Sequence, residues 1–199
     1  MFANIENAVD QCSIYTRTAT KLRTKGALAV GFKLFGTSLL FISCHLSHGK
    51  SLLLRVKDYR KIVRQLDLRH LNLSGYSAID KVHGVFWFGD LNFRVGESRF
   101  EIEKLITSSD KTREQIIAKL LEKDQLRQEI RNNSTFNGFQ EGPVNFLPTY
   151  KYDIGCEEFD TSAKQRAPAY TKTATFRLLV VSEQFSDVLS DEMKEASLK

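Results

Sequence analysis

The pattern of apolar and polar positions predicts a hairpin of two strands near the start of the chain. Residues 26–34 alternate roughly between apolar and polar side chains, whereas residues 38–44 are more continuously apolar. Alternation indicates a strand with one solvated face, and a short continuous run indicates a buried strand. Gly36-Thr37 is a turn signal between the two segments. The second strand delivers His45 at its C-terminal end.

Helical periodicity predicts three helices. In residues 51–67 apolar side chains recur every three or four positions, and charged side chains fill the other face. Residues 99–106 and 112–130 show the same period and are rich in Glu, Lys, Gln and Leu. Two interpretations of the basic face of the first helix stay open, namely a solvated surface and a surface that contacts a membrane.

The remaining segments complete a mixed architecture. The short apolar run 85–91 predicts a second buried strand, and residues 70–82 predict a loop. Residues 136–168 predict a long irregular segment, which in a compact domain is usually functional. Residues 173–181 predict a last strand, before a polar tail at 182–199. Strands broken by helices predict an α/β fold with ligand chemistry along one sheet edge.

Composition and charge narrow the class of protein. Of the 199 residues, 42% are hydrophobic and 27% charged, as in soluble globular proteins, and the net charge is +5. A basic chain permits an anionic partner such as phosphate, a lipid head group or nucleic acid, without selecting one. Cys12, Cys44 and Cys156 lack paired spacing, which argues against disulfides and structural zinc and indicates a reducing compartment. No apolar run approaches the roughly 20 residues of a membrane span, and the N-terminus lacks signal-peptide features.

The strongest chemical signal directly follows the second buried strand. Asp90 and Asn92 are separated by one residue, so in an extended segment both side chains face one site. The carboxylate can accept a proton from water or hold a hard cation, and the carboxamide can donate to a phosphate oxygen or ligate a cation. Gly89 lets the backbone turn beside them. On Gly89 and Asp90 alone, a strand-end turn with a capping Asp is the simpler interpretation.

The octet at residues 87–94, with the pattern Trp-x-Gly-Asp-x-Asn-x-Arg, resembles the signature of the inositol-polyphosphate 5-phosphatases. These enzymes belong to the endonuclease/exonuclease/phosphatase superfamily, whose fold is a β-sandwich flanked by helices. The resemblance covers about residues 13–171, and two segments look closest to the cilium-associated, lipid-directed branch. Further segments match in the same order: Thr24-Lys25-Gly26-Ala27, Ser43-Cys44-His45-Leu46, Arg55 with Asp58-Tyr59, Phe139-Gln140-Glu141-Gly142, 146–153, 159–162 and 164–170.

The resemblance implies a Mg²⁺-dependent enzyme that removes the 5-phosphate from phosphatidylinositol 4,5-bisphosphate or 3,4,5-trisphosphate. In such catalysis the protein mainly positions and stabilises charge. The resemblance implies that Asp90 activates the water, Asn92 orients it or stabilises the pentavalent phosphorus, and His45 donates to the scissile phosphate. The family's metal-binding Glu has no counterpart here, which leaves Asn92 as a candidate metal ligand. Without the resemblance, a hydrogen-bonded strand-end histidine is the simpler interpretation of His45.

Four residues match positions that hold the neighbouring 4-phosphate in the family, namely Tyr150, Lys151, Lys164 and Arg166. Arg offers phosphate oxygens a planar fork, and Lys offers a compact charge. Taken alone, the cations are ordinary surface charges, and Tyr150 is a packing residue. The implied partners are phosphoinositide head groups at a membrane surface, with no nucleic acid. The implied location is cytoplasmic and peripheral at membranes, at the cilium or Golgi.

The sequence departs from the family at both ends. Nothing before Thr24 supplies the family's Gln-Glu motif. Lys172 replaces the Asp that orients a catalytic histidine, and no histidine follows the substrate loop. We therefore expect an incomplete catalytic domain over residues 1–181 and a divergent tail over 182–199. We also expect low stability and little phosphatase activity of the isolated chain.

Two alternatives to the phosphatase stay open. One is a non-catalytic chain that binds phosphoinositides or a partner through the basic loop. The other is a nuclease of the same superfamily, which needs a basic or aromatic surface for a DNA backbone. Residues 148–153 and 164–168 favour inositol phosphates over DNA, and no basic cluster stands out beyond ordinary helix faces.

Overall fold

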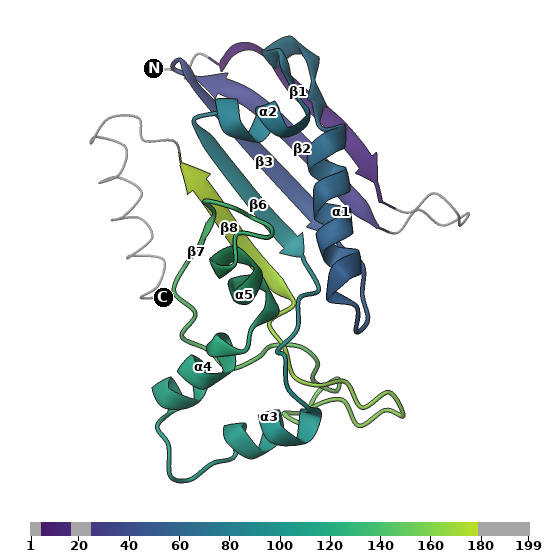
Figure 1. The fold of residues 1–199 in the computed structure, drawn as a ribbon, viewed down its shortest axis with the longest axis vertical. Helices are drawn as coiled ribbons and strands as arrows, with labels where there is room; N and C mark the ends of the chain where they lie inside the picture. Colours follow the sequence, from purple (N-terminus) through teal and green to yellow (C-terminus); the bar gives the residue numbers. More distant parts are fainter. Residues whose placement is uncertain (1–4, 17–24, 179–199) are drawn as a thin grey trace.

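The computed structural model describes residues 5–16 and 25–178, and within them one large sheet has six strands. Their order is β1-β2-β3-β6-β8-β7 (Figure 1). Neighbouring strands are antiparallel except β3 and β6, which run parallel and therefore end at the same edge of the sheet. The strands are β1 (Ile5–Tyr15), β2 (Gly26–Leu34), β3 (Thr37–His45), β6 (Gly84–Asp90), β7 (Gln140–Glu141) and β8 (Lys172–Leu178).

The predicted strands are confirmed where the structure describes them. The hairpin of residues 26–34 and 38–44 is β2 and β3, joined by a turn at Phe35 and Gly36 with φ of 49° and 78°. The run 85–91 corresponds to β6, and β8 corresponds to the last predicted strand up to residue 178. Strand β1 was not predicted, because its pairing with β2 shifts register between Glu6 and Asp10 and the alternation is interrupted there.

Two of the predicted helices are confirmed. α1 (Leu52–Gln65) fills the segment 51–67, and α3 (Arg99–Ile106) has the predicted bounds. Ser98 begins α3 by accepting a hydrogen bond from the Glu101 amide, which satisfies one of the free N–H groups of the first turn.

The loop predicted at residues 70–82 is wrong. The segment contains a short 3-10 turn, η1 (Arg69–Leu71), and a helix, α2 (Gly75–Lys81). A small two-stranded sheet of β4 (Asp67–Leu68) and β5 (Leu73–Ser74) encloses the turn. A seven-residue helix is too short to show a period, and its stability comes from burying Ala78 and Ile79 in the core.

The single helix predicted at residues 112–130 is also wrong, because the chain breaks it into α4 (Arg113–Glu122) and α5 (Gln125–Arg131). Asp124 lies at the break and accepts a hydrogen bond from the Arg127 amide, so that it caps α5. Its backbone also pairs with Val95 in an isolated bridge. This pairing between distant segments ends α4, and a local helical period does not reveal it.

Helices α1, α2 and α5 cover one face of the sheet (Figure 1). The sheet side chains that face them are buried and form one cluster with apolar residues of the helices, such as Ile62 and Leu126. A smaller cluster lies between α3, α4 and the loops, built around Ile102, Ile116 and Tyr170. The central side chains of the sheet in the first cluster are Ala29, Leu40, Ile42, Val85 and Trp87.

The opposite face of the sheet is also apolar. Phe41 stacks between Phe32 and Phe86, with ring centroids 5.7 Å and 4.9 Å apart. Leu28 and Phe88 on this face are 46% and 37% exposed. The predicted mixed α/β class is confirmed, and the described residues contribute one large sheet with helices packed on one face.

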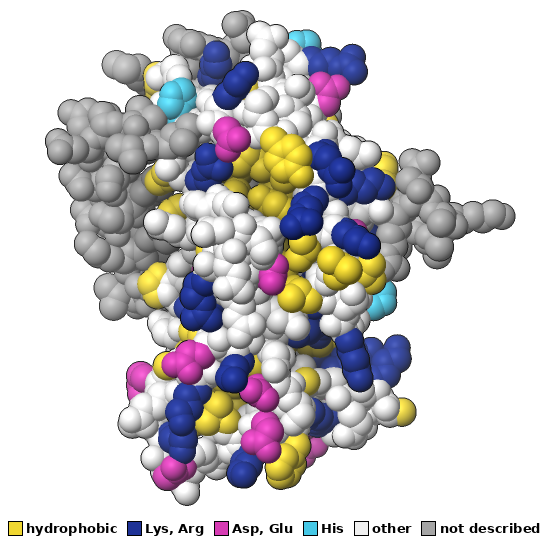
Figure 2. Space-filling model, in the orientation of Figure 1, with side chains coloured by type: hydrophobic (Ala, Val, Ile, Leu, Met, Phe, Trp, Pro, Cys, Tyr) yellow, Lys and Arg dark blue, Asp and Glu magenta, His cyan; other side chains and the backbone are white. Residues whose placement is uncertain are grey.

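Some sequence features lie outside the described residues. Thr24 of the first matched segment, the end of the last predicted strand at residues 179–181 and the tail 182–199 belong to this group. In the described part of the chain, no helix is both long and apolar enough to cross a membrane. The basic residues of α1 gather on the face seen in Figure 2, whereas acidic and basic side chains are mixed over α3 and α4.

Asp124 gives a test of this packing. Burial raises its pKa to about 6, and the nearby Glu141 charge adds to this. A raised acid pKa means that the folded protein binds the proton more tightly, so Asp124 lowers the free energy of unfolding as pH rises from about 4 to 6. Asp124→Asn keeps an acceptor for the cap. We expect it to raise the free energy of unfolding at pH 7 by about 1–3 kcal/mol.

Urea denaturation at pH 4.5 and pH 7 measures this effect. The gain at pH 7 is expected to shrink at pH 4.5, where Asp124 of the unsubstituted chain is already protonated when folded. Asp110→Asn, at an exposed site, is the control and is expected to give no such gain. A loss of stability in Asp124→Asn at pH 7 contradicts the assignment of a destabilising buried charge.

Candidate active site

The parallel pairing of β3 with β6 places His45 directly beside Asp90. His45 Nε2 lies 3.4 Å from Asp90 Oδ2, and the Leu46 amide donates to the Asp90 carbonyl at 3.0 Å, which extends the pairing past the strand ends. Gly89 permits this close approach, because its φ is +123° and a Cβ there would lie 2.2 Å from the Cys44 carbonyl oxygen. The other carboxylate oxygen, Asp90 Oδ1, is buried without a hydrogen-bond partner.

Lys25 is a third member of this cluster. Its side chain is buried, and its ammonium group is hydrogen-bonded to His45 Nε2. Because an ammonium group only donates, Nε2 is the acceptor and the ring proton of a neutral His45 is on Nδ1. Burial, and then the Lys25 charge, lower the pKa of His45, while Asp90 opposes them. Lys25 belongs to a segment that matches the family, Thr24-Lys25-Gly26-Ala27, but no role in the site was predicted for it.

This arrangement changes what His45 can do. Its Nε2 accepts from Lys25, so Nε2 donates to a phosphate oxygen only after Lys25 releases it and Nε2 itself carries a proton. The Lys25 ammonium is itself a phosphate-binding group at the same place. A surface pocket borders both residues, and it is also lined by Tyr15 and Ser43.

Asn92 lies beside this cluster in a different backbone conformation from the one predicted. Its φ is 57°, in the left-handed region that Asn tolerates, and therefore the extended geometry expected from Asp90 to Asn92 is wrong. The side chain is 3% exposed and held at both ends. Its Nδ2 donates to the Leu46 carbonyl at 3.1 Å, and its Oδ1 accepts from Arg94 at 2.9 Å.

The same contacts bear on metal binding. The Asn92 oxygen faces the Arg94 guanidinium, a cation, so it does not fit the predicted metal ligand. Asp90 Oδ1 does fit, since it is a carboxylate oxygen without a protein partner and Mg²⁺ binds through one or two carboxylates plus substrate phosphates. Among residues 5–16 and 25–178, no group of three or more His, Cys, Asp or Glu side chains is arranged to hold a metal ion.

Arg94 connects Asn92 to the substrate loop. Its guanidinium carbon lies 4.5 Å from the centre of the Tyr150 ring, within the range of a cation–π contact. The Arg94 amide donates to Gln125 Oε1, which also accepts from the buried Arg55. Burial, and then the Arg94 charge, lower the pKa of Arg55 to about 10. The sequence included Arg94 in the octet without a role.

A second cluster gathers two of the predicted phosphate-binding cations around Asp160. Lys151 Nζ lies 3.5 Å from one Asp160 oxygen, and Arg166 donates to the other at 2.9 Å from its side chain and from its amide. The Asp160 side chain is fully buried, whereas those of Lys151 and Arg166 are 40% and 29% exposed. Hydrogen bonds from Ser162 and Arg166 hold the pKa of Asp160 well below its usual range.

The predicted substrate residues are thus only partly brought together. Tyr150 directly precedes Lys151 and contacts Arg94 and, through a backbone bridge, Ala169, but in the described part of the chain not Asp160. Lys164 is exposed, and its backbone amide donates to the Ser162 hydroxyl at 3.4 Å. Asp160 is the residue that sequence reasoning missed. The sequence feature that could have identified Asp160 is its position in the matched segment 159–162, between two matched segments that contain Lys151 and Arg166.

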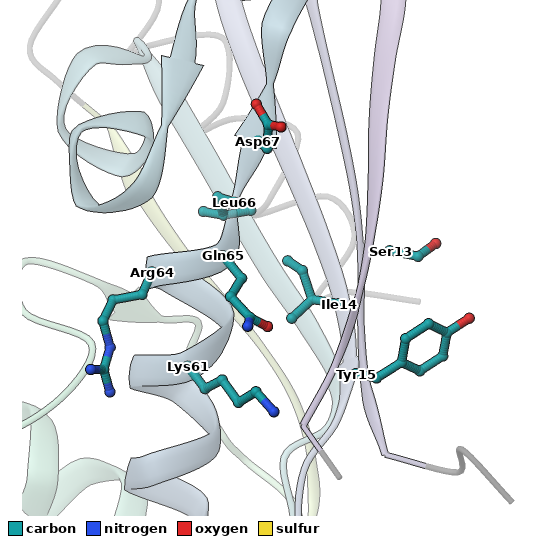
Figure 3. A pocket seen from close by; sticks show the side chains of 8 residues that line it. All are labelled: Ser13, Ile14, Tyr15, Lys61, Arg64, Gln65, Leu66 and Asp67. Carbon is teal, nitrogen blue, oxygen red and sulfur yellow. The ribbon is translucent and has the colours of Figure 1, made fainter. Parts of the chain in front are cut away.

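A pocket between β1 and α1 is not part of this site. Figure 3 shows Lys61 and Gln65 pointing toward β1, while Arg64 points away from it and Tyr15 lies on the far side of the strand. Lys61 donates to the Thr16 carbonyl at 3.2 Å. The polar groups do not converge, so the pocket offers no common position for a ligand.

Comparison with known proteins identifies the family of the chain. Residues 3–187 match the model of endonuclease/exonuclease/phosphatase family 2. The human phosphatidylinositol polyphosphate 5-phosphatase type IV is 38% identical over 176 residues, which are 84% of this chain and 27% of that protein. The human phosphatidylinositol 4,5-bisphosphate 5-phosphatase A is 39% identical over 148 residues, 74% of this chain and 14% of that protein.

Solved structures agree as well. The inositol polyphosphate 5-phosphatase domain of SPsynaptojanin, in complex with inositol (1,4)-bisphosphate and a calcium ion, superposes with a TM-score of 0.73 at 34% identity. The superposition covers 87% of this chain and 48% of that one. Cimex nitrophorin, at 22% identity and a TM-score of 0.60, shares the fold.

The chain thus spans less than a third of the length of these relatives and about half of the solved domain. The predicted resemblance to the inositol-polyphosphate 5-phosphatases is confirmed. The chain belongs to endonuclease/exonuclease/phosphatase family 2, and its homologues within that family are phosphoinositide 5-phosphatases.

Proposed function

We propose that this chain contributes the hydrolytic edge and the 4-phosphate site of a phosphoinositide 5-phosphatase, with phosphatidylinositol 4,5-bisphosphate or 3,4,5-trisphosphate as substrate. The observation that carries the proposal is the arrangement of two polar clusters, with Arg94 between Asn92, which follows the first cluster in the chain, and Tyr150, which precedes Lys151 of the second. One is His45, Asp90 and Lys25 at the ends of β3 and β6. The other is formed by Lys151 and Arg166 around Asp160. The names of the relatives support this substrate class.

The residues of the first cluster suit hydrolysis of a phosphate ester. Asp90, whose side chain is 30% exposed, supplies a carboxylate that accepts the proton of an attacking water through Oδ2, as a general base must, while the buried Oδ1 is the oxygen that fits a metal ion. Lys25 supplies a fixed positive charge, and His45 a second polar group, beside the position of the scissile phosphate. Asn92 acts as a donor to the phosphoryl group if its amide exchanges the Leu46 carbonyl for a phosphate oxygen.

We propose Mg²⁺ as the metal, held through Asp90 together with substrate phosphate. When bound, it neutralises charge that develops on the phosphoryl oxygens. The solved relative was crystallised with a calcium ion, which supports a divalent cation at this site. Two further points remain predictions from the sequence. One is the division into residues 1–181 and 182–199, and the other is a cytoplasmic, membrane-peripheral location at the cilium or Golgi.

The second cluster suits a phosphate next to the scissile one. The side chains of Lys151 and Arg166 are partly exposed, and each pairs with the buried Asp160 carboxylate. The solved relative binds inositol (1,4)-bisphosphate, which has a 4-phosphate and no 5-phosphate. A non-catalytic protein that binds phosphoinositides is the alternative, because this cluster needs no metal and does not depend on Asp90.

Phosphate release from vesicles containing phosphatidylinositol 4,5-bisphosphate tests the hydrolytic role. Because the family's metal-binding Glu has no counterpart in this sequence, we expect release by the 199-residue chain to be low, to require Mg²⁺ and to fall by about a further 100-fold in Asp90→Asn, the usual effect of removing a general base. Asp67→Asn, which changes an exposed carboxylate paired with Arg69, is the control and is expected to retain full activity. Release that persists in Asp90→Asn contradicts the role, and binding without release favours the non-catalytic alternative.

Asp160→Asn tests the second cluster. Removing the charge that orients Lys151 and Arg166 is expected to weaken binding of inositol (1,4)-bisphosphate about tenfold, because hydrogen bonds to charged groups contribute about 1.5–3 kcal/mol. Isothermal titration calorimetry measures the dissociation constant. Asp153→Asn, in the same loop and bonded to Thr161, is the control and is expected to change it little. Tighter binding by Asp160→Asn indicates that Asp160 competes with phosphate for the cations.

A further inference from the structure

One side chain, Arg94, contacts a neighbour of each cluster of the proposed site. Its terminal nitrogen donates to Asn92 Oδ1 at 2.9 Å, and its guanidinium carbon lies over the Tyr150 ring, 4.5 Å from the ring centre. Asn92 follows the strand that ends at Asp90, whereas Tyr150 directly precedes Lys151 in the substrate loop. The two residues are 58 positions apart in the chain, so this contact is made by the fold.

The backbone of Arg94 is fixed by a hydrogen bond, whereas its charged guanidinium group contacts neutral partners. The backbone amide donates to Gln125, whose side-chain oxygen also accepts from Arg55. In the described part of the chain, the guanidinium contacts the Asn92 oxygen and the Tyr150 ring, neither of which is charged. Its Nε is buried without a hydrogen-bond partner. A cation with neutral partners only is attracted strongly by an anion that arrives nearby.

A movement of Arg94 toward an anion would act on Asn92, its hydrogen-bond partner. Both polar atoms of its side chain are engaged, one by Arg94 and the other by the Leu46 carbonyl. Because the amide group is planar and rigid, its oxygen and nitrogen turn together, so lengthening the Arg94 bond removes one of the two bonds that hold the orientation of the whole group. The backbone of Asn92 is fixed by its amide, which donates to the Thr171 carbonyl at 3.1 Å. The response is therefore confined to the side chain.

We propose that Arg94 is a positioning residue that couples phosphate at the Lys151–Arg166 cluster to the orientation of the Asn92 amide. The inference rests on the proposed function. A phosphate bound beside Tyr150 draws the guanidinium toward the loop, the Arg94–Asn92 bond lengthens, and the Asn92 amide turns toward the Asp90 edge. The vicinal 4-phosphate then acts on the hydrolytic edge as well as on affinity.

The test follows the Asn92 side-chain amide by NMR in the uniformly ¹⁵N-labelled full chain, with Asn92→Asp used to assign the signal. The probes are inositol (1,4)-bisphosphate and, as the ligand without a 4-phosphate, inositol 1-phosphate. We expect the bisphosphate to shift the Asn92 signal at saturation and the monophosphate to leave it in place. In Arg94→Lys, which keeps the charge and loses the planar fork and the stacking, we expect the bisphosphate to bind within about threefold of the original affinity while the Asn92 signal no longer responds.

The outcomes separate this inference from the function on which it rests. If the bisphosphate does not bind the unsubstituted chain, the proposed 4-phosphate site is wrong, and the coupling with it. If it binds and Asn92 responds equally in Arg94→Lys, the site stands and the coupling is overturned. If Arg94→Lys weakens binding about tenfold or more, Arg94 is a phosphate ligand and not a positioning residue.

Tyr150→Leu is the second variant, in case Arg94→Lys fails to fold as judged by circular dichroism. It removes the aromatic face from Arg94 and leaves the Arg94–Asn92 bond intact. The coupling predicts that Asn92 loses its response to the bisphosphate in this variant as well. A normal response at saturation in folded Tyr150→Leu overturns the route through the ring.

Discussion

The parallel pairing of β3 with β6 is the constraint on which the site depends. It places the ends of two strands at one edge and sets His45 opposite Asp90. The close contact between Gly89 and the Cys44 carbonyl leaves no space for a side chain, so a single residue type permits this alignment. Below it, the fully buried Trp87 fixes the strand against the helices. The edge is therefore rigid before any ligand arrives, which a hydrolytic centre requires.

Charge is distributed unevenly around this edge. Lys151 and Arg166 share one buried carboxylate, and Arg94 contacts only neutral groups in the described part of the chain. Arg55 lies close enough for Arg94 to lower its pKa. The local excess of positive charge suits a ligand with two adjacent phosphates better than one with a single charge. The net charge of +5 for the whole chain has the same sign, but it does not say where the positive charge lies.

Local sequence patterns predicted much of the fold but few of the side-chain contacts within the site. The strands at 26–34 and 38–44 and the helix at 99–106 were visible because alternation and helical period are properties of neighbouring residues. The break at Asp124 depends on its pairing with Val95, and the contact of Lys25 with His45 spans 20 positions. Such contacts leave no periodic trace. The octet identified the family, but it did not reveal that the Asn92 oxygen faces Arg94.

The two faces of the sheet differ in what they contribute to the site. The helix-covered face buries the side chains beneath Asp90 and Asn92, such as Trp87 and Leu91, and thus fixes where the strand ends lie. The other face exposes Leu28, Phe88 and Leu178 beside a stacked row of aromatic rings, and within residues 5–16 and 25–178 it contributes no partner to Asn92. Because Asn92, Arg94 and Tyr150 are linked through contacts of their own, the coupling between the two phosphate positions depends on the helix-covered layer and the substrate loop. Packing on the exposed face changes the stability of the strands more directly than the chemistry at their ends.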